Sequence, residues 1–128
     1  MPTIKLEIVE AHNLMIADIT SSDPYVEIQA SNDKKILKTK VIKKNLNPVW
    51  NEEFIIDLEN PKLDTLQFTV KDWDRFSKDD PLGKCKIVNF SNFMMGQTND
   101  LWLNLQDSET DAKLHVVVTP IDFGKCLP

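Results

Sequence analysis

The chain of 128 residues is long enough for one domain with a single core and too short for two. A net charge of −5 and a pI near 4.9 exclude nucleic acid as an expected partner, and an acidic membrane needs a charge-reversing device. No apolar run approaches the roughly 20 residues that span a bilayer, and residues 1–10 do not resemble a signal peptide, so a cytoplasmic protein is expected.

Short segments in which apolar and polar residues alternate follow one another along the chain, the pattern of half-buried strands. In the first, Ile4, Leu6 and Ile8 alternate with Lys5 and Glu7. Residues 91–96 have room for one helical turn, and no longer segment carries a helical stripe. The expected strands cover residues 4–8, 25–30, 36–43, 53–58, 66–70, 83–90, 101–105 and 113–120.

Many short strands without alternating helices predict an all-β fold, an eight-stranded antiparallel Greek-key β-sandwich. One domain is expected over residues 1–122, with residues 123–128 as a C-terminal tail. The loops of such a sandwich gather at its two ends, where functional residues usually lie. The connections between the strands are therefore the places to look for a site.

The isolated bulky or reactive residues are expected to have structural roles. Cys85 shares a strand face with Ile87 and is expected in the core, and Cys126 is expected to be a free thiol because the chain lacks a secretory signal. Trp50 and Trp102 are expected to be packing residues and not ligands. The two histidines have no nucleophile beside them, so no catalytic residue and no enzyme activity are expected.

Two groups of aspartates lie in the predicted connections: Asp18 with Asp23 after the first strand, and four within residues 72–80 after the fifth. Aspartate is common in turns, and this alternative stays open for the first group. Asp72 and Asp74 project to one face, with no cation between them in sequence. Carboxylates about 4 Å apart repel by about 1 kcal/mol in water and about 4 kcal/mol at an effective dielectric constant of about 20. We therefore expect a cation there.

The types of donor indicate which cation this is. Hard oxygen ligands without His or Cys favour Ca²⁺ or Mg²⁺ over zinc or copper. Irregular loops supply the roughly six to eight oxygens that Ca²⁺ accepts, whereas Mg²⁺ demands stricter octahedral geometry, so Ca²⁺ is favoured. An EF-hand is excluded, because counting from Asp72 places Ser77 and Gly83 where that motif needs Gly and Glu.

The sequence resembles the C2 domain family, a calcium-dependent phospholipid-binding module, from about residue 4 to residue 120. Small plant-type and protein kinase C-type members are similar. The chain opens on the strand before the first acidic loop, which resembles the type II strand order of the family. The resemblance is carried, with Asp18, by AHNL at 11–14, SDPYV at 22–26, NLNPVWNEEF at 45–54, DWDRFSKDD at 72–80 and LG at 82–83.

This resemblance implies that two or more Ca²⁺ ions bind where the two acidic loops meet. Asp79 matches a more variable position. The interval from Asp18 to Asp23 is five residues where many members have six, which leaves the shape of the first loop open. The implied ligands are the side chains of Asp18, Asp23, Asp72, Asp74, Asp80 and Ser77 and the backbone carbonyls of Ala17 and Trp73.

A site of this kind implies Ca²⁺-dependent binding to anionic phospholipid membranes, phosphatidylserine in particular, by a monomer that associates peripherally when Ca²⁺ rises. Bound ions would nearly cancel the charge of the aspartates, and lipid oxygens would complete the ions' shells. Arg75 is expected to contact lipid phosphate. The apolar Ile16, Ile19 and Phe76 are expected to dip into the bilayer, with Phe76 folding back over its loop as an equal alternative.

A run of lysines surrounds the third strand, and within it Lys38 and Lys40 share a face that suits phosphoinositide headgroups. A solvated strand face is the favoured alternative, because Glu27 and Gln29 stand where members with such a site carry lysines. The run comprises Lys34, Lys35, Lys38, Lys40, Lys43 and Lys44.

Two other functions compete with Ca²⁺-dependent membrane binding. A C2 module that binds proteins without Ca²⁺ would carry a vestigial acidic tip. A metal-dependent hydrolase would use the aspartates to activate water, but the sequence offers it no general base and no oxyanion-hole motif. The near-complete set of expected ligands favours membrane binding over the protein-binding module.

Overall fold

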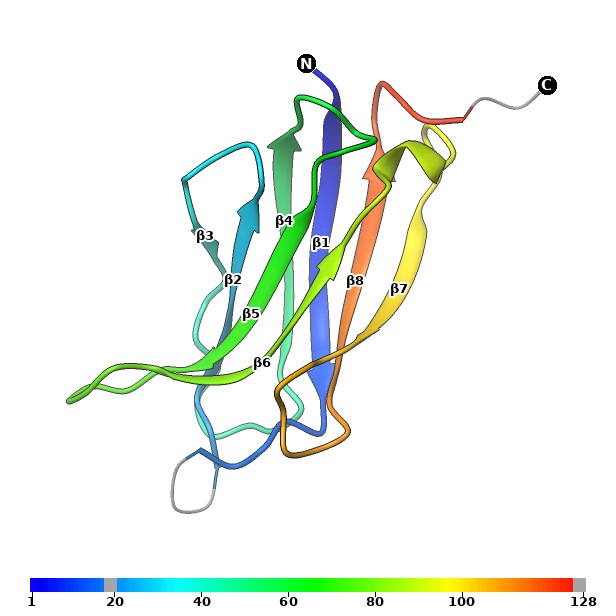
Figure 1. The fold of residues 1–128 in the computed structure, drawn as a ribbon. Coiled ribbons are helices and arrows are strands. Elements are labelled where there is room, and N and C mark those ends of the chain that lie inside the picture. The colour runs from blue at the N-terminus through cyan, green and yellow to red at the C-terminus, as the bar shows by residue number, and fades with distance from the viewer. Residues whose placement is uncertain (18–20, 126–128) are drawn as a thin grey trace.

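The computed structural model of this chain describes residues 1–17 and 21–125. Two antiparallel sheets of four strands pack face to face, in the orders β4-β1-β8-β7 and β3-β2-β5-β6 (Figure 1). A short 3-10 turn, η1 (Phe90–Asn92), precedes β7. The strands are β1 (Thr3–His12), β2 (Pro24–Ala30), β3 (Leu37–Lys38), β4 (Val49–Asp57), β5 (Leu66–Asp72), β6 (Asp80–Ile87), β7 (Asn99–Asn104) and β8 (Lys113–Pro120).

The predicted eight-stranded β-sandwich is confirmed, and β8 lies between β1 and β7, the type II order that the resemblance implies. β3 has two residues and not the expected eight, because the Thr39 hydroxyl accepts the Val26 amide (2.8 Å) and interrupts the regular backbone ladder. β4 begins at Val49, four residues earlier than expected. None of the helical segments in the described part of the chain has the length or apolarity needed to cross a bilayer.

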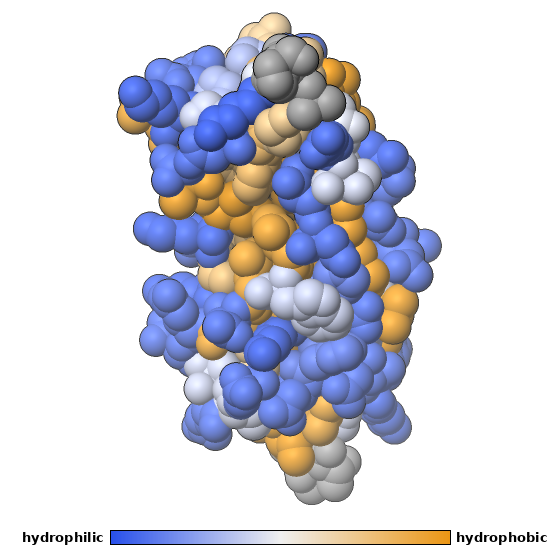
Figure 2. Space-filling model, turned by 90° about the vertical axis from the view of Figure 1, so that its right-hand side faces the viewer, coloured by the Kyte–Doolittle hydropathy of each residue, from blue (hydrophilic) through white to orange (hydrophobic). Residues whose placement is uncertain are grey.

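Alternation places one face of each strand in a shared core. Leu66, Phe68 and Val70 of β5 are fully buried between the sheets. Cys85 on β6 is buried as predicted, on the same face as Ile87, and burial raises the pKa of its thiol to about 12, so it stays protonated. On the side of β7 the apolar interior reaches the surface as a band between the sheets (Figure 2).

A bulge between β5 and β6 sets the position of the second acidic loop. Val70 pairs with Gly83 and Lys71 with Pro81, so the register shifts between these two pairs. Gly83 has a φ of +149°, and a Cβ atom there would lie 2.9 Å from the Cβ of Leu105, so a side chain does not fit. The last pair of the β5–β6 ladder is Asp72 with Asp80, the acidic ends of the two strands.

Segments outside the strands pack against the same core. Trp50 is buried, and its Nε1 donates to the Lys40 carbonyl (2.9 Å), which confirms its packing role. Beyond β8, Phe123 packs against the core, and the Lys125 amide donates to the Phe93 carbonyl (2.8 Å). The predicted boundary after residue 122 stays a prediction, and residue 126, the second cysteine, lies outside the described residues.

Candidate functional site

The strand register brings the two acidic loops to the same end of the sandwich, opposite the end where β1 begins and β8 ends (Figure 1). Asp72, the last residue of β5, pairs with Pro24 of β2 on one side and with Asp80 of β6 on the other. Asp23 directly precedes β2, and it therefore lies beside Asp72 although 49 residues separate them. Two other predicted residues of the first loop, Asp18 and Ile19, lie outside the described residues.

Asp72 links the bases of the two loops. It is 3% exposed, and its Oδ1 accepts the Asp23 amide (2.6 Å). The Trp73 amide donates in turn to the Asp23 carbonyl (2.9 Å), and the Asp23 Oδ1 accepts the Lys44 amide (2.7 Å). Backbone amides therefore hold these two aspartates at the bases of the two acidic loops.

Asp74 organises the crest of the second loop. Its Oδ1 accepts the amides of Phe76 (2.8 Å) and Ser77 (3.3 Å), and its Oδ2 accepts the Ser77 hydroxyl (2.8 Å). The Phe76 amide and then the Ser77 hydroxyl lower the pKa of the Asp74 carboxyl below its ordinary value. Asp74 is thus ionised at neutral pH, and Ser77 lies beside it.

Asp79 joins the second loop to β2, a contact that the sequence did not indicate. Its Oδ1 accepts the Asp74 amide (2.9 Å), and its Oδ2 accepts the hydroxyl of Tyr25. The Tyr25 hydroxyl and the Asp74 amide lower the pKa of Asp79, while burial and then Asp79 raise the pKa of Tyr25. Both carboxylate oxygens of Asp79 are therefore engaged with protein donors.

The chemistry of these donors fits Ca²⁺. Both loops offer carboxylates and a hydroxyl and contain neither His nor Cys, and no ion pair in the described part of the chain joins Asp23, Asp74 or Asp80 to a cation. Among residues 1–17 and 21–125, however, no three acidic, His or Cys side chains are grouped closely enough to hold a metal ion. The described residues thus supply the right donors without yet converging on one point.

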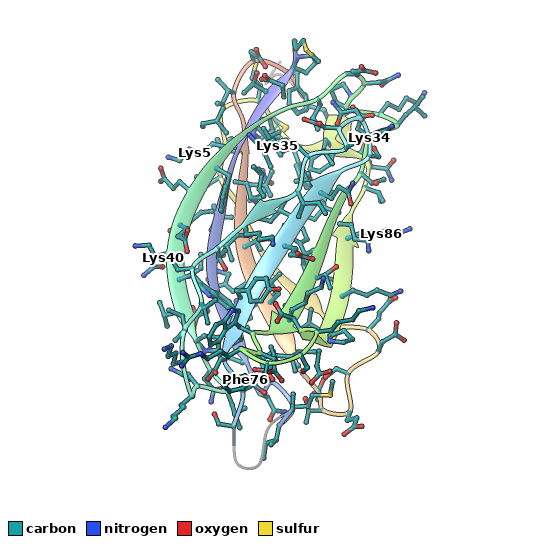
Figure 3. The ribbon with its side chains drawn as sticks, turned by 90° about the vertical axis from the view of Figure 1, so that its left-hand side faces the viewer. Lys5, Lys34, Lys35, Lys40, Phe76 and Lys86 are labelled. Carbon is teal, nitrogen blue, oxygen red and sulfur yellow. The ribbon has the colours of Figure 1, made fainter. Side chains whose placement is uncertain are left out.

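Exposed side chains surround this acidic tip. Asp23, Asp74 and Ser77 line a hollow of about 470 Å³ together with Trp73, Arg75 and Phe76. Phe76 is 90% exposed at the crest, which excludes the alternative that it folds back over its loop (Figure 3). The Arg75 guanidinium lies 5.6 Å from the Phe76 ring centre, and in the first loop Ile16 is exposed while Ala17 is half-buried.

The lysines form no single pocket. Figure 3 shows Lys34 and Lys35 toward the end of the sandwich opposite Phe76. Lys40 lies at a height between these two lysines and Phe76. Lys38 and Lys71 both pair with Glu27, at 3.7 Å and 2.7 Å, so one carboxylate offsets charge in the middle of the expected patch. This arrangement favours the solvated-face interpretation for Lys38.

A second polar cluster, on the outer face of the first sheet, was not anticipated from the sequence. The Trp102 ring is 44% exposed and stacks on His115 of β8 at 4.2 Å, so it packs at the surface and not in the core. Glu10 of β1 accepts from His12 (2.7 Å) and from His115 Nδ1 (3.0 Å), and His115 Nε2 contacts Asp100. Burial opposes protonation of His115, but these two carboxylates raise its pKa above the ordinary value.

The stability of the fold should therefore depend on pH through His115. Because its pKa is raised in the folded state, its contribution is fully present below the ordinary pKa of about 6.5 and is lost as the pH rises through the folded value. We expect His115→Gln to flatten this loss in urea unfolding measured between about pH 5 and pH 9. If the free energy of unfolding falls equally with rising pH in the two proteins above about pH 6.5, His115 is not the group responsible.

Comparison with known proteins agrees with this architecture. A C2 domain profile matches residues 2–105. Protein C2-DOMAIN ABA-RELATED 5 of Arabidopsis thaliana is 40% identical over 100 residues, 77% of this chain and 48% of that protein. A solved C2 domain of plant Extended Synaptotagmin 1 has a TM-score of 0.83 at 29% identity, covering 97% of both chains.

A calcium-bound structure of two C2 domains of Extended-Synaptotagmin 2 has a TM-score of 0.79 at 27% identity, over 93% of this chain and 45% of that one. This chain spans about half the length, or less, of the curated relatives it matches. The profile match, the sequence identity and the shared fold lead to one conclusion. The chain belongs to the C2 domain family.

Proposed function

We propose that this domain binds anionic phospholipid membranes, such as those that contain phosphatidylserine, when Ca²⁺ occupies the acidic tip. The observation that carries the proposal is the meeting of two acidic loops at one end of the sandwich, beside a Phe76 that is 90% exposed. The match to C2 domains, a non-catalytic module, supports a role in membrane binding. The calcium-bound neighbour supports the choice of ion.

The proposed ligands divide between the two loops. When bound, Ca²⁺ would supply positive charge against the carboxylates and open coordination positions for lipid oxygens. Asp79 is left out of the set because one of its oxygens accepts the hydroxyl of Tyr25, a buried side chain that would lose this partner if Asp79 turned to an ion. The residues that would hold two or more ions are Asp18, Asp23, Asp72, Asp74, Asp80 and Ser77, with the carbonyls of Ala17 and Trp73.

Charge explains why such an ion would act as a switch. The protein carries a net charge of −5, and the tip concentrates carboxylates, so the metal-free tip should be repelled by an anionic bilayer. Neutralising the tip removes this repulsion without requiring a change of fold. We accordingly propose that the domain associates peripherally with membranes when Ca²⁺ rises. A cytoplasmic location and a monomeric state are proposed with it from the sequence alone.

The direct test is sedimentation with vesicles. The protein should pellet with phosphatidylserine-containing vesicles in Ca²⁺, remain in the supernatant with a chelator, and remain there with pure phosphatidylcholine vesicles in Ca²⁺. Calorimetric titration of Ca²⁺, with and without the vesicles, measures the ions bound. Pelleting that is unchanged by the chelator would refute the proposal.

Phe76 should contribute to membrane binding through its apolar ring. Burying an aromatic side chain contributes about 1.5–3 kcal/mol, so we expect Phe76→Ala to weaken vesicle binding by about tenfold or more. Ca²⁺ binding without vesicles should change little, because Asp74 meets the Phe76 amide and not the ring. Val88→Ala, another exposed apolar residue, is the matched control and should bind vesicles like the wild type.

The arrangement of the described carboxylates favours one other function. Because no three of them are grouped for a metal as they stand, a C2 module that binds a protein partner without Ca²⁺ is the second candidate. It predicts no calorimetric response to Ca²⁺, with or without vesicles. A phosphoinositide site at Lys38 and Lys40 would be a further proposal, and the pairing of Lys38 with Glu27 weakens it.

A further inference from the structure

We propose that Tyr25 and Asp79 form a clamp that sets the shape of the β5–β6 loop before any ion binds, with Asp79 as a positioning residue and not as a calcium ligand. The statement about the loop concerns the metal-free protein. The statement about Ca²⁺ affinity rests on the proposed function. The experiments below separate the two.

The clamp begins on a rigid element. Tyr25 is the second residue of β2, it is 5% exposed, and it pairs across the sheet with Lys71 of β5. A buried tyrosine within a ladder cannot follow a moving loop, so its hydroxyl is a fixed anchor. The hydrogen bond to Asp79 Oδ2 thus ties the loop to the second sheet.

The clamp continues from Asp79 into the loop. The second oxygen of Asp79 accepts the Asp74 amide (2.9 Å), which fixes the backbone at the residue whose own carboxylate accepts the Phe76 and Ser77 amides. The route from β2 to the crest therefore consists of consecutive hydrogen bonds. Each of these bonds ends on an ionised carboxylate, and such bonds are stronger than those between neutral groups.

The same contacts argue against direct ligation by Asp79. To face an ion, its carboxylate would have to release the hydroxyl of Tyr25, which lies in a buried side chain. Leaving a buried hydroxyl unpaired is unfavourable. Asp80, by contrast, is exposed at the start of β6 and pairs with Asp72, so it is the better placed acidic residue of this adjacent pair.

Amide hydrogen exchange in the metal-free protein tests the clamp directly, because the Asp74 amide is its reporter. Tyr25→Phe removes one oxygen atom and keeps the ring. We expect the Asp74 amide to exchange about tenfold faster in this variant, as a hydrogen bond to a charged group contributes on that order. The Trp73 amide, which donates to the Asp23 carbonyl (2.9 Å), should keep its wild-type rate and serves as the internal control.

Calcium titration then decides the role of Asp79. We expect Tyr25→Phe and Asp79→Ala to weaken Ca²⁺ binding by a similar factor, about three- to tenfold, with the same number of ions as the wild type. Glu59→Ala, which removes an exposed acid in the connection between β4 and β5, should change neither quantity.

Two outcomes would overturn the inference. An unchanged Asp74 exchange rate in Tyr25→Phe refutes the clamp, whatever Ca²⁺ does. Loss of an ion in Asp79→Ala alone makes Asp79 a ligand. If the wild type binds no Ca²⁺, the proposed function and the affinity statement fail together, while the exchange rates still decide whether the clamp exists.

Discussion

Asp72→Asn combined with Asp74→Asn is expected to abolish Ca²⁺-dependent pelleting with phosphatidylserine vesicles and to weaken Ca²⁺ binding by at least about a hundredfold. Both residues are proposed to supply charged oxygens from the same loop, and asparagine offers only a neutral carbonyl. The new amide side chain at position 72 keeps an oxygen that can accept the Asp23 amide, so the loop bases should stay joined. Calorimetry and sedimentation of the double variant measure both effects.

A charge-matched control separates ligation from bulk charge. Glu7→Gln combined with Glu59→Gln also removes two negative charges, one in the middle of β1 and one beyond β4, both away from the tip. This control should bind Ca²⁺ and vesicles like the wild type. If the two double variants behave alike, the net charge and not a site governs binding, and the proposed ligand set is wrong.

Phe68→Ala is expected to lower the free energy of unfolding by about 3–5 kcal/mol, a large part of the roughly 5–15 kcal/mol that stabilises an ordinary domain. Phe68 is fully buried in β5, where it pairs with Ile28 on one side and Cys85 on the other. Truncation leaves a cavity in the centre of the core, which the flanking strands cannot close because they belong to one hydrogen-bonded sheet.

Urea unfolding followed by tryptophan fluorescence measures this change. Gln67→Ala, at the next position on the same strand with its side chain exposed, is the control and should change stability little. A loss below about 1 kcal/mol in Phe68→Ala would mean that the core rearranges around the smaller side chain, contrary to the packing described above.

The strands could be predicted because their pattern is local. Ile4, Leu6 and Ile8 alternate with less buried neighbours, and each such segment is identified without knowing its partner. β3 was predicted too long because its shortening depends on a side chain, Thr39, that replaces a backbone acceptor for Val26. The alternation of apolar and polar residues does not indicate where a side chain takes the place of a backbone acceptor.

The candidate site divides in the same way. The aspartates could be selected because several of them crowd within short loops. The contacts of Tyr25 with Asp79 and of His115 with Glu10 join residues 54 and 105 positions apart, so only the strand order brings them together. Side chains that position a site are therefore harder to identify from a single sequence than the side chains that form it.

The position of the chain ends relative to the acidic loops has a mechanical consequence. β1 begins and β8 ends at the end of the sandwich opposite these loops (Figure 1). A strand rises about 3.3 Å per residue, so the ten residues of β1 span about 30 Å between the two ends. If the acidic end rests on a bilayer, any polypeptide joined to either terminus starts one domain length above the lipid surface. The domain then acts as a spacer of fixed height as well as an anchor.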